Sequence, residues 1–188
     1  RQEFSTPGMS WADSLGNARV LAQWRAGAGL EYDIEKPARR THTLAGRTLK
    51  AGRTIAHRSL PGLPKKLSQV VLGFEDFRTF SSGAILLDAF FEAGGNLFDT
   101  GFVYGGGRTE ALLGEWLDNR GVREQSVVIG KGAHSPLCYP DMIGKQLTQS
   151  LDRLKSGHVD IYFMHRDNPD VPVGEFVDAM DAEVKAGR

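Results

Sequence analysis

Four polar side chains stand at or just beyond the ends of short apolar runs, and their types suit acid–base chemistry. Asp99 closes the run NLFD, Lys131 closes SVVIGK, and His165 closes VDIYFMH. Tyr104 follows Asp99 by five residues, inside the stretch FDTGFVYGGG. A phenol has an ordinary pKa near 10, and an ammonium group beside it favours the phenolate and lowers that pKa.

Together the four groups could protonate a carbonyl oxygen while hydride arrives at its carbon. An aspartate paired with a lysine keeps the lysine charged and in place, and a histidine can hold a substrate oxygen. Each residue also has a structural interpretation: Lys131 as a strand-end surface cation, His165 as a structural histidine, Tyr104 as a loop aromatic. Their coincidence at successive strand ends favours one shared site.

The elements that must position these residues are short apolar runs, typical of strands, which alternate with segments of helical periodicity. The run VDIYFMH is typical of a strand buried on both faces, and the last helical segment carries an apolar stripe. Four β-α units in a row predict a parallel sheet, either doubly wound or the start of an eight-stranded barrel. Strands are expected at 67–74, 96–99, 126–131 and 159–165, helices at 81–95, 109–121, 140–155 and 171–187, and the stripe at Val173, Phe176, Val177, Met180 and Val184.

Composition restricts the class of protein. Hydrophobic residues make up 40% and charged residues 24% of the 188 residues, which is typical of a soluble globular protein. The sequence contains neither an apolar run near the ~20 residues that span a bilayer nor the pattern of a signal peptide, so a cytoplasmic location is expected. The single cysteine, Cys138, excludes an internal disulfide and a zinc site made of thiolates.

The N-terminal third differs in charge from the rest. Residues 1–66 hold 12 Lys and Arg against 5 Asp and Glu, a net charge of +7, whereas the remainder holds 11 against 18, a net charge of −7. A helix is predicted from about Trp11, capped by Ser10 and ended by Gly27 or Gly29, with an apolar stripe at Trp11, Leu15, Ala18, Leu21 and Ala22. The basic stretch after it lacks interleaved aromatic residues for base stacking, so a solvated linker is favoured over nucleic-acid binding.

From about Leu67 onward the chain resembles the aldo-keto reductase family, over roughly the first half of that family's barrel. FDTGFVYGGGRTEALLG is similar to the family pattern of Phe-Asp-Thr, then Tyr-Gly, then a Glu and a Leu-Gly on the next helix. SVVIGK is similar to the strand that ends in the catalytic lysine. LTQSLDRLKSGHVDIYFMH is similar to the helix and strand that lead to the catalytic histidine.

The resemblance implies a (β/α)8 TIM barrel, of which about the first four β-α units are present, and an NADPH- or NADH-dependent reductase of aldehydes or ketones. Tyr104 is then the general acid, Lys131 and Asp99 tune its pKa, and His165 orients the carbonyl. Gly73, Phe74 and Asp99 are the implied cofactor contacts, and no metal is expected. The glycines 105–107 are expected to let the backbone turn sharply beside Tyr104, where a side chain would crowd the site.

Some residues depart from the family pattern. Gly101 stands where the family often has Ala, Gly130 where it has Thr, and LGFEDF where Gly-Thr usually follows the first strand. Because such a barrel takes about 250 residues, we expect the chain to be an internal part of a longer protein and inactive by itself.

The first segment also resembles another family. WADSLGNARVLAQWRAGAGLEYDIEKP is similar to the C-terminal tail of the glucose-fructose oxidoreductase and inositol dehydrogenase-like family. This implies a fused upstream dehydrogenase domain and a sugar-derived carbonyl as substrate. The expected organisation is a helical tail at 1–35, a basic linker at 36–66 and the half-barrel at 67–188.

Two other functions fit the pattern less well. The first is a barrel of the same family that binds the cofactor but serves as a regulatory partner. The second is a metal-dependent barrel hydrolase with Asp99, His134 and His165 as ligands. No His-x-His pair is present, although metal sites in barrels usually use one. Neither nucleic acid nor a membrane is an expected partner.

Overall fold

The computed structural model describes residues 8–32, 48–73 and 79–188. Contacts divide the chain into two compact units, Arg1–Arg40 and Thr41–Arg188. None of the helices in the described ranges is long and apolar enough to cross a membrane.

The described part of the first unit is a helix, α1, which spans Trp11–Gly27. The predicted N-cap is confirmed: the Ser10 hydroxyl accepts the Asp13 N–H at 3.1 Å, and the Asp13 carboxylate accepts the Ser10 N–H at 2.9 Å. These hydrogen bonds form a capping box. The Ser10 hydroxyl also donates to the Asp13 carboxylate at 2.6 Å, and this bond holds the pKa of Asp13 below its usual value. The predicted apolar stripe stays exposed, with Trp11 at 74% and Leu15 at 57%.

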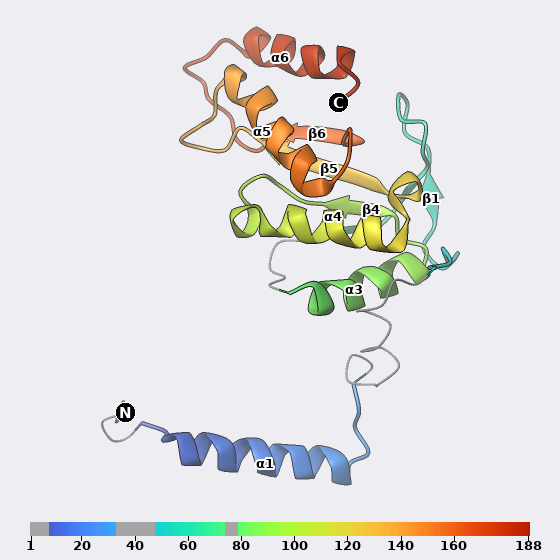
Figure 1. The fold of residues 1–188 in the computed structure, drawn as a ribbon, viewed down its shortest axis with the longest axis vertical. Helices are drawn as coiled ribbons and strands as arrows, with labels where there is room; N and C mark the ends of the chain where they lie inside the picture. Colours follow the sequence, from blue (N-terminus) through green and yellow to red (C-terminus); the bar gives the residue numbers. More distant parts are fainter. Residues whose placement is uncertain (1–7, 33–47, 74–78) are drawn as a thin grey trace. The chain divides into compact units, whose positions relative to one another are not determined.

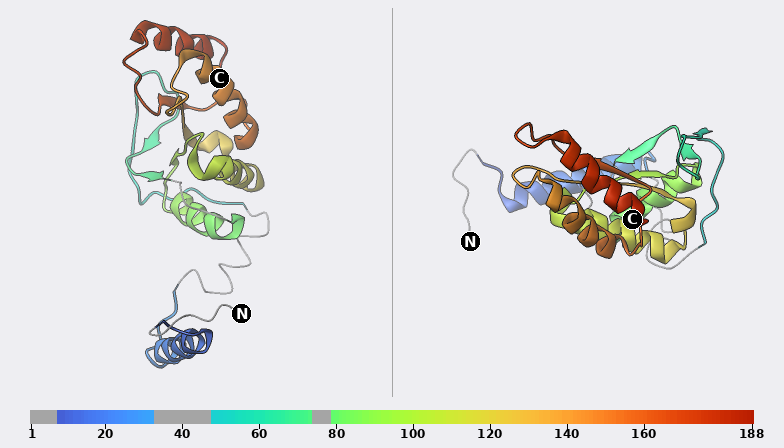
Figure 2. Two further views of the ribbon diagram at one scale, coloured as in Figure 1. Left: turned by 90° about the vertical axis from the view of Figure 1, so that its left-hand side faces the viewer. Right: turned by 90° about the horizontal axis from the view of Figure 1, so that it is seen from above.

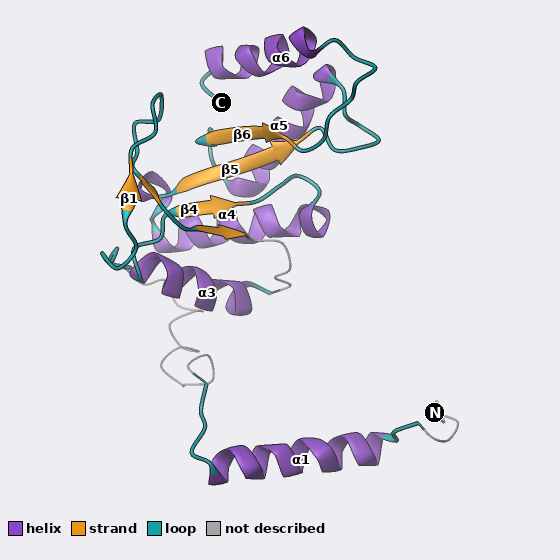
Figure 3. Ribbon diagram, turned by 180° about the vertical axis from the view of Figure 1, so that it is seen from behind, coloured by secondary structure: helices purple, strands orange, loops and turns teal. Residues whose placement is uncertain are grey.

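The second unit is built around a four-stranded parallel sheet. Its strands are β3 Val71–Gly73, β4 Leu97–Asp99, β5 Val127–Gly132 and β6 Ile161–Met164. They lie in the order of the chain, β3-β4-β5-β6. Their arrowheads point the same way where β4, β5 and β6 are seen from behind (Figure 3). The carboxyl ends of neighbouring strands therefore lie along one edge, as the sequence predicts.

Four helices follow these strands: α3 Phe80–Glu92, α4 Arg108–Arg120, α5 Pro140–Leu154 and α6 Val173–Lys185. The view in Figure 1 looks onto the layer of α3, α4 and α5, and Figure 2 shows these helices on one side of the strands. A doubly wound sheet has helices on both faces. Sequential strand order with the helices on one face is instead the arrangement of an α/β barrel, here open and present in part.

Aromatic packing between the helices and the sheet forms the main core. Trp116 of α4 is fully buried, with its ring 6.1 Å from Phe91 and 5.3 Å from Phe98 between centroids. Its indole N–H donates to Asp88 at 2.8 Å, and Arg120 donates to the same carboxylate at 2.9 Å. This buried carboxylate therefore joins α3 to α4 with its polar atoms satisfied.

The sheet begins differently from the sequence prediction. Residues 67–74 were predicted as one strand, but they form β2 Leu67–Ser68, antiparallel to β1 His57–Arg58, and then β3. Ser68 is buried, and its hydroxyl donates to the Val70 carbonyl at 2.7 Å. This local bond bends the chain between the two short strands. Phe74 lies outside the described residues.

Part of the segment 36–66, expected to be a basic linker, makes contacts with the second unit. Within its described residues, 48–66, Leu49 is 5% exposed and joins the main core. The N–H of Ile55 donates to the Ala93 carbonyl at 3.0 Å, and β1 pairs with β2. These contacts make the segment part of the second unit. The sequence pattern did not predict them, because the apolar residues that pack are scattered and have no regular period. The domain boundaries at 35 and 66 stay predictions.

The end of the chain is more exposed than its apolar pattern indicates. The run in β6 was predicted to be buried on both faces, but Phe163 is 52% exposed because β6 is the edge strand of this sheet. On α6 only Phe176 is buried, whereas Val173 and Val184 are 77% and 74% exposed. The predicted apolar stripe on α6 is therefore mostly exposed in this structure.

Candidate active site

An ion pair joins the ends of β4 and β5. The Lys131 ammonium lies 2.8 and 2.7 Å from the two carboxylate oxygens of Asp99. Both side chains are partly buried, at 16% and 27% exposure. Burial alone would lower the pKa of Lys131, but the hydrogen bonds to Asp99 and to the Tyr104 phenol outweigh it and raise that pKa above its usual value. Lys131 is therefore a fixed cation at neutral pH.

Tyr104 lies against this cation. The Lys131 nitrogen is 5.0 Å from the centroid of the Tyr104 ring, and the phenol interacts with it. The Tyr104 and His165 rings meet edge to face with centroids 5.3 Å apart. The structure thus brings together the predicted catalytic residues Asp99, Tyr104, Lys131 and His165.

His165 follows β6 and is held by its backbone, since its N–H donates to the Gly132 carbonyl at 2.6 Å. Burial, then the neighbouring His134, Lys131 and Arg166, lower the pKa of the imidazole below 6.5. Its Nδ1 is buried and has no hydrogen-bond partner among the described residues. At neutral pH the ring is uncharged, so one ring nitrogen is a donor and the other an acceptor.

A second imidazole borders the first. His134, in the loop after β5, lies with its ring centroid 4.8 Å from that of His165. The loop is shaped by Ala133, which has φ 53°, and by buried Gln146, whose side-chain oxygen accepts the Ala133 N–H at 2.8 Å. Sequence reasoning considered His134 only as a metal ligand. In the described part of the chain, no group of three His, Cys, Asp or Glu side chains could hold a metal ion.

The turn after Tyr104 has the predicted backbone. The short 3-10 helix η2, Tyr104–Gly107, contains three successive residues with positive φ, at 56°, 66° and 89°. A β-carbon on Gly107 would lie 2.4 Å from the Arg153 guanidinium carbon, so the crowding falls on Arg153. Arg153 and its buried partner Glu110 are site neighbours that sequence reasoning missed, because the arginine lies about 50 residues from the tyrosine in the chain.

The predicted cofactor contacts are described in part. Gly73 ends β3 and pairs in register with Asp99. Among the described residues, a β-carbon built on Gly73 meets no atom within 4 Å. Phe74 lies outside the described residues. Gly73 and Asp99 therefore lie beside each other at the ends of two neighbouring strands.

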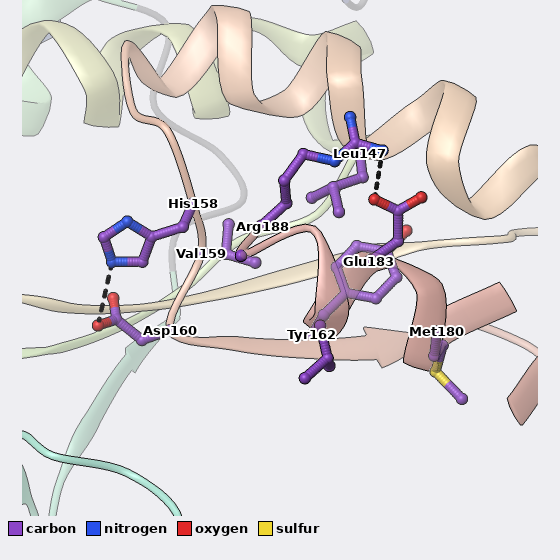
Figure 4. Close-up of a pocket in the computed structure, with 10 residues that line it drawn as sticks. Leu147, His158, Val159, Asp160, Tyr162, Met180, Glu183 and Arg188 are labelled. Atoms are coloured by element: carbon purple, nitrogen blue, oxygen red, sulfur yellow. Dashed lines mark ion pairs between the residues drawn. The ribbon is translucent and has the colours of Figure 1, made fainter. Parts of the chain in front are cut away.

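A separate cavity of about 420 Å³ lies between β6, α5 and α6. Figure 4 shows His158, Val159 and Asp160 at the amino end of β6, and Tyr162, Met180 and Glu183 around the rest of the cavity. Among the described residues the Tyr162 hydroxyl has no hydrogen-bond partner, and burial, then Glu110 and Glu183, raises the pKa of that phenol. The cavity includes none of the four predicted catalytic residues.

Comparison with known proteins agrees with this fold. Residues 75–188 match the model of the aldo/keto reductase family, and the chain belongs to that family. It is 28% identical over 171 residues to aflatoxin B1 aldehyde reductase member 2 of Rattus norvegicus, covering 88% of this chain and 42% of the relative. It is 33% identical over 106 residues to aldo-keto reductase str7 of Strobilurus tenacellus, covering 55% and 31%. An uncharacterized oxidoreductase of Bacillus subtilis, YrpG, is 29% identical over 119 residues, covering 55% and 36%. The chain thus spans 31% to 42% of the length of these relatives.

Proposed function

We propose that the protein reduces an aldehyde or ketone to an alcohol, with NADPH or NADH as hydride donor. The observation that carries this proposal is the Tyr104 phenol beside the Lys131 ammonium, which Asp99 holds through both carboxylate oxygens. Family membership supports the reaction class. The names of relatives from rat and mouse specify an aldehyde, so aldehydes are the first substrates to test. A sugar-derived carbonyl follows from the resemblance of the N-terminal segment.

In this mechanism Tyr104 donates its phenolic proton to the carbonyl oxygen. Lys131 stabilises the phenolate that remains, and Asp99 keeps the lysine charged. The neutral His165 ring donates a hydrogen bond to the carbonyl oxygen and orients it. A bound nicotinamide supplies hydride to the carbonyl carbon, and Gly73 and Asp99 would border it.

The other candidate functions have less support. Asp99 is engaged by Lys131 through both oxygens, which leaves it unsuited to join His134 and His165 around a metal. A regulatory barrel that only binds the cofactor does not need a phenol beside a fixed cation. The fused upstream dehydrogenase domain, the small-molecule substrate and the cytoplasmic location stay predictions.

The experiment is NADPH and NADH oxidation by the complete gene product that contains these residues, with a panel of aldehydes and ketones. Tyr104→Phe removes one oxygen, so we expect turnover to fall by about 10²- to 10⁴-fold with cofactor affinity and melting temperature nearly unchanged. Tyr139→Phe is the matched control, because Tyr139 is 47% exposed in the loop before α5. Near wild-type turnover by Tyr104→Phe would remove the tyrosine from the mechanism.

A further inference from the structure

The loop that carries Tyr104 is held by side chains from outside the loop. Its three glycines with positive φ give the backbone wide freedom in the unfolded chain, so its conformation needs external contacts. The Arg108 side chain, at the start of α4, donates to the Gly105 carbonyl at 3.0 Å. Two further contacts lie closer to the tyrosine: Thr109 donates to the Tyr104 carbonyl at 3.0 Å, and Arg153 of α5 donates to the Phe102 carbonyl at 3.0 Å. Both contacts lie within two residues of the phenol.

The Phe102 peptide connects the tyrosine loop with the catalytic cation. Its N–H donates to the carbonyl of Lys131 at 2.8 Å, while its carbonyl accepts from Arg153. The Arg153 guanidinium also lies 4.6 Å from the centroid of the Phe102 ring. Phe102 is therefore fixed at three points, and the chain between it and Tyr104 is one residue long.

Arg153 is itself fixed by a buried carboxylate. The same nitrogen that reaches Phe102 lies 2.9 Å from an oxygen of Glu110, whose side chain is fully buried on α4. Burial raises the pKa of Glu110, although hydrogen bonds to Ser150 and Arg153 oppose the rise. A buried carboxylate is a costly component of a core and adds little net stability when paired. Its geometric effect is clear, because it orients the guanidinium toward the loop.

Gly107 is matched to this arrangement. A β-carbon there would lie 2.4 to 2.7 Å from three atoms of the Arg153 guanidinium. The glycine thus supplies the space in which the arginine approaches the loop, as well as the left-handed turn. Glycine, arginine and carboxylate come from three elements, η2, α5 and α4.

We propose that Arg153, oriented by Glu110, is a positioning residue that holds the Tyr104 loop against Lys131. This proposal rests on the proposed function in one respect, namely that the Tyr104 phenol is the reacting group that the loop positions. The loop anchoring itself is a property of the chain that can be measured without turnover.

The test uses Arg153→Met and Arg153→Lys in the complete gene product, with Lys145→Met as the matched control. Lys145 is an exposed cation on the same helix, paired with Asp141 four residues away. We expect amide hydrogen exchange in residues 100–108 to become at least about ten-fold faster in Arg153→Met while the β5 amides stay protected. Arg153→Lys keeps the charge and loses the planar fork, so its effect is intermediate.

Kinetics supply the second readout. Because displacing a reacting group by about 1 Å can cost about 10²-fold, kcat should fall by about that factor in Arg153→Met while NADPH affinity stays within about three-fold. A purely structural arginine would lower the melting temperature without faster exchange confined to residues 100–108. Unchanged exchange in that segment, in either Arg153 variant, overturns the proposal whether or not the protein reduces carbonyls. Faster exchange in a protein whose Tyr104→Phe variant keeps full activity would instead refute the proposed function and leave the anchoring intact.

Discussion

The two ends of the parallel sheet carry ion pairs that look alike in the sequence and differ in the structure. At the carboxyl end Asp99 pairs with Lys131, and at the amino end Asp160 pairs with Lys65 and Arg123, each at 2.9 Å. Asp160 is 4% exposed and also accepts the Val128 N–H at 2.9 Å. Asp99 is 27% exposed and lies beside a phenol and an imidazole.

The difference shows that the groups surrounding an ion pair decide whether it is a candidate functional site. Around Asp160, two cations and one backbone N–H occupy the carboxylate, so little remains for a ligand. Around Lys131, the nearest groups are the titratable Tyr104 ring and His165 beyond it. The groups around Asp160 are occupied with one another, whereas the carboxyl-end pair lies beside the predicted proton donor Tyr104.

The largest effect is expected from Lys131→Met, which keeps the volume and removes the charge beside Tyr104. Turnover should fall by about 10²-fold or more, because the phenolate loses its stabilising cation, while cofactor affinity stays within about three-fold. Steady-state kinetics and NADPH titration measure the two quantities. Lys65→Met, at the other end of the sheet, is the control and should leave turnover of the folded protein unchanged. An equal loss of affinity and turnover would make Lys131 a cofactor anchor.

The next largest effect is expected on stability from Asp160→Asn. Removing the charge from this buried carboxylate should cost about 1–3 kcal/mol of unfolding free energy, since Lys65 and Arg123 lose their partner. Asp118→Asn, in the exposed pair with Lys155, should cost less than about 0.5 kcal/mol. Denaturant unfolding compares the variants. Equal losses for both would contradict the distinction between buried and exposed pairs.

The same carboxylate predicts a pH dependence. Burial would raise the pKa of Asp160, but Lys65, the Val128 N–H and Arg123 lower it below its ordinary 3.8. Because the folded-state pKa is the lower one, this stabilisation is complete above pH 3.8 and is lost as pH falls through the folded-state pKa. Unfolding free energies of the wild type and Asp160→Asn should therefore converge below pH 3.8. A constant difference down to that range would count against the lowered pKa.

A smaller effect, on the pH dependence of stability, is expected from the titration of His165. Its pKa is lowered, first by burial, so the imidazole should titrate with a midpoint below 6.5 and stay neutral above it. NMR titration of the histidine ring signals measures the midpoint, with His165→Gln for assignment. Stability from this group is complete above pH 6.5 and is lost as pH falls through the lower folded-state value. A midpoint above 6.5 would indicate that the negative charge of Asp99 outweighs burial and the neighbouring cations.

The smallest effect is expected from Gly101→Ala. This change introduces the alanine that the aldo-keto reductase pattern often has at this position. A β-carbon there would meet Lys131 and Tyr104 at 3.5 Å, which is ordinary contact. Turnover should change by less than about three-fold, the equivalent of about 0.65 kcal/mol. A large loss of turnover would show that the site needs the open backbone at this position.

The sequence predicted best the features that depend on neighbouring residues. The N-cap at Ser10, the alternation of strands and helices, and the turn at Gly105–Gly107 depend on neighbouring residues, and the structure confirms them. The gathering of Asp99, Tyr104, Lys131 and His165 was also predicted, because parallel strands bring their carboxyl ends to one edge. Their chemical roles stay predictions.

Other features depended on contacts that no local pattern records. Residues 67–73 divide between two sheets because Ser68 bonds within the turn and to Asn96, which is 28 residues away. Leu49 joins the core from a segment that reads as a basic linker. Phe163 in the apolar run of β6 is exposed because burial depends on which strand lies beside it, and here β6 is an edge.

The amino-acid sequence by itself determined which groups stand at the strand ends and how the backbone turns beside Tyr104. Residue type, spacing and glycine placement act over a few positions, so they can be read along the chain. Tertiary structure alone decided that Lys131 meets both oxygens of Asp99 and that Arg153 holds the tyrosine loop. These contacts join residues 32 and 51 positions apart, and their distances follow from how α5 and β5 pack against their neighbours.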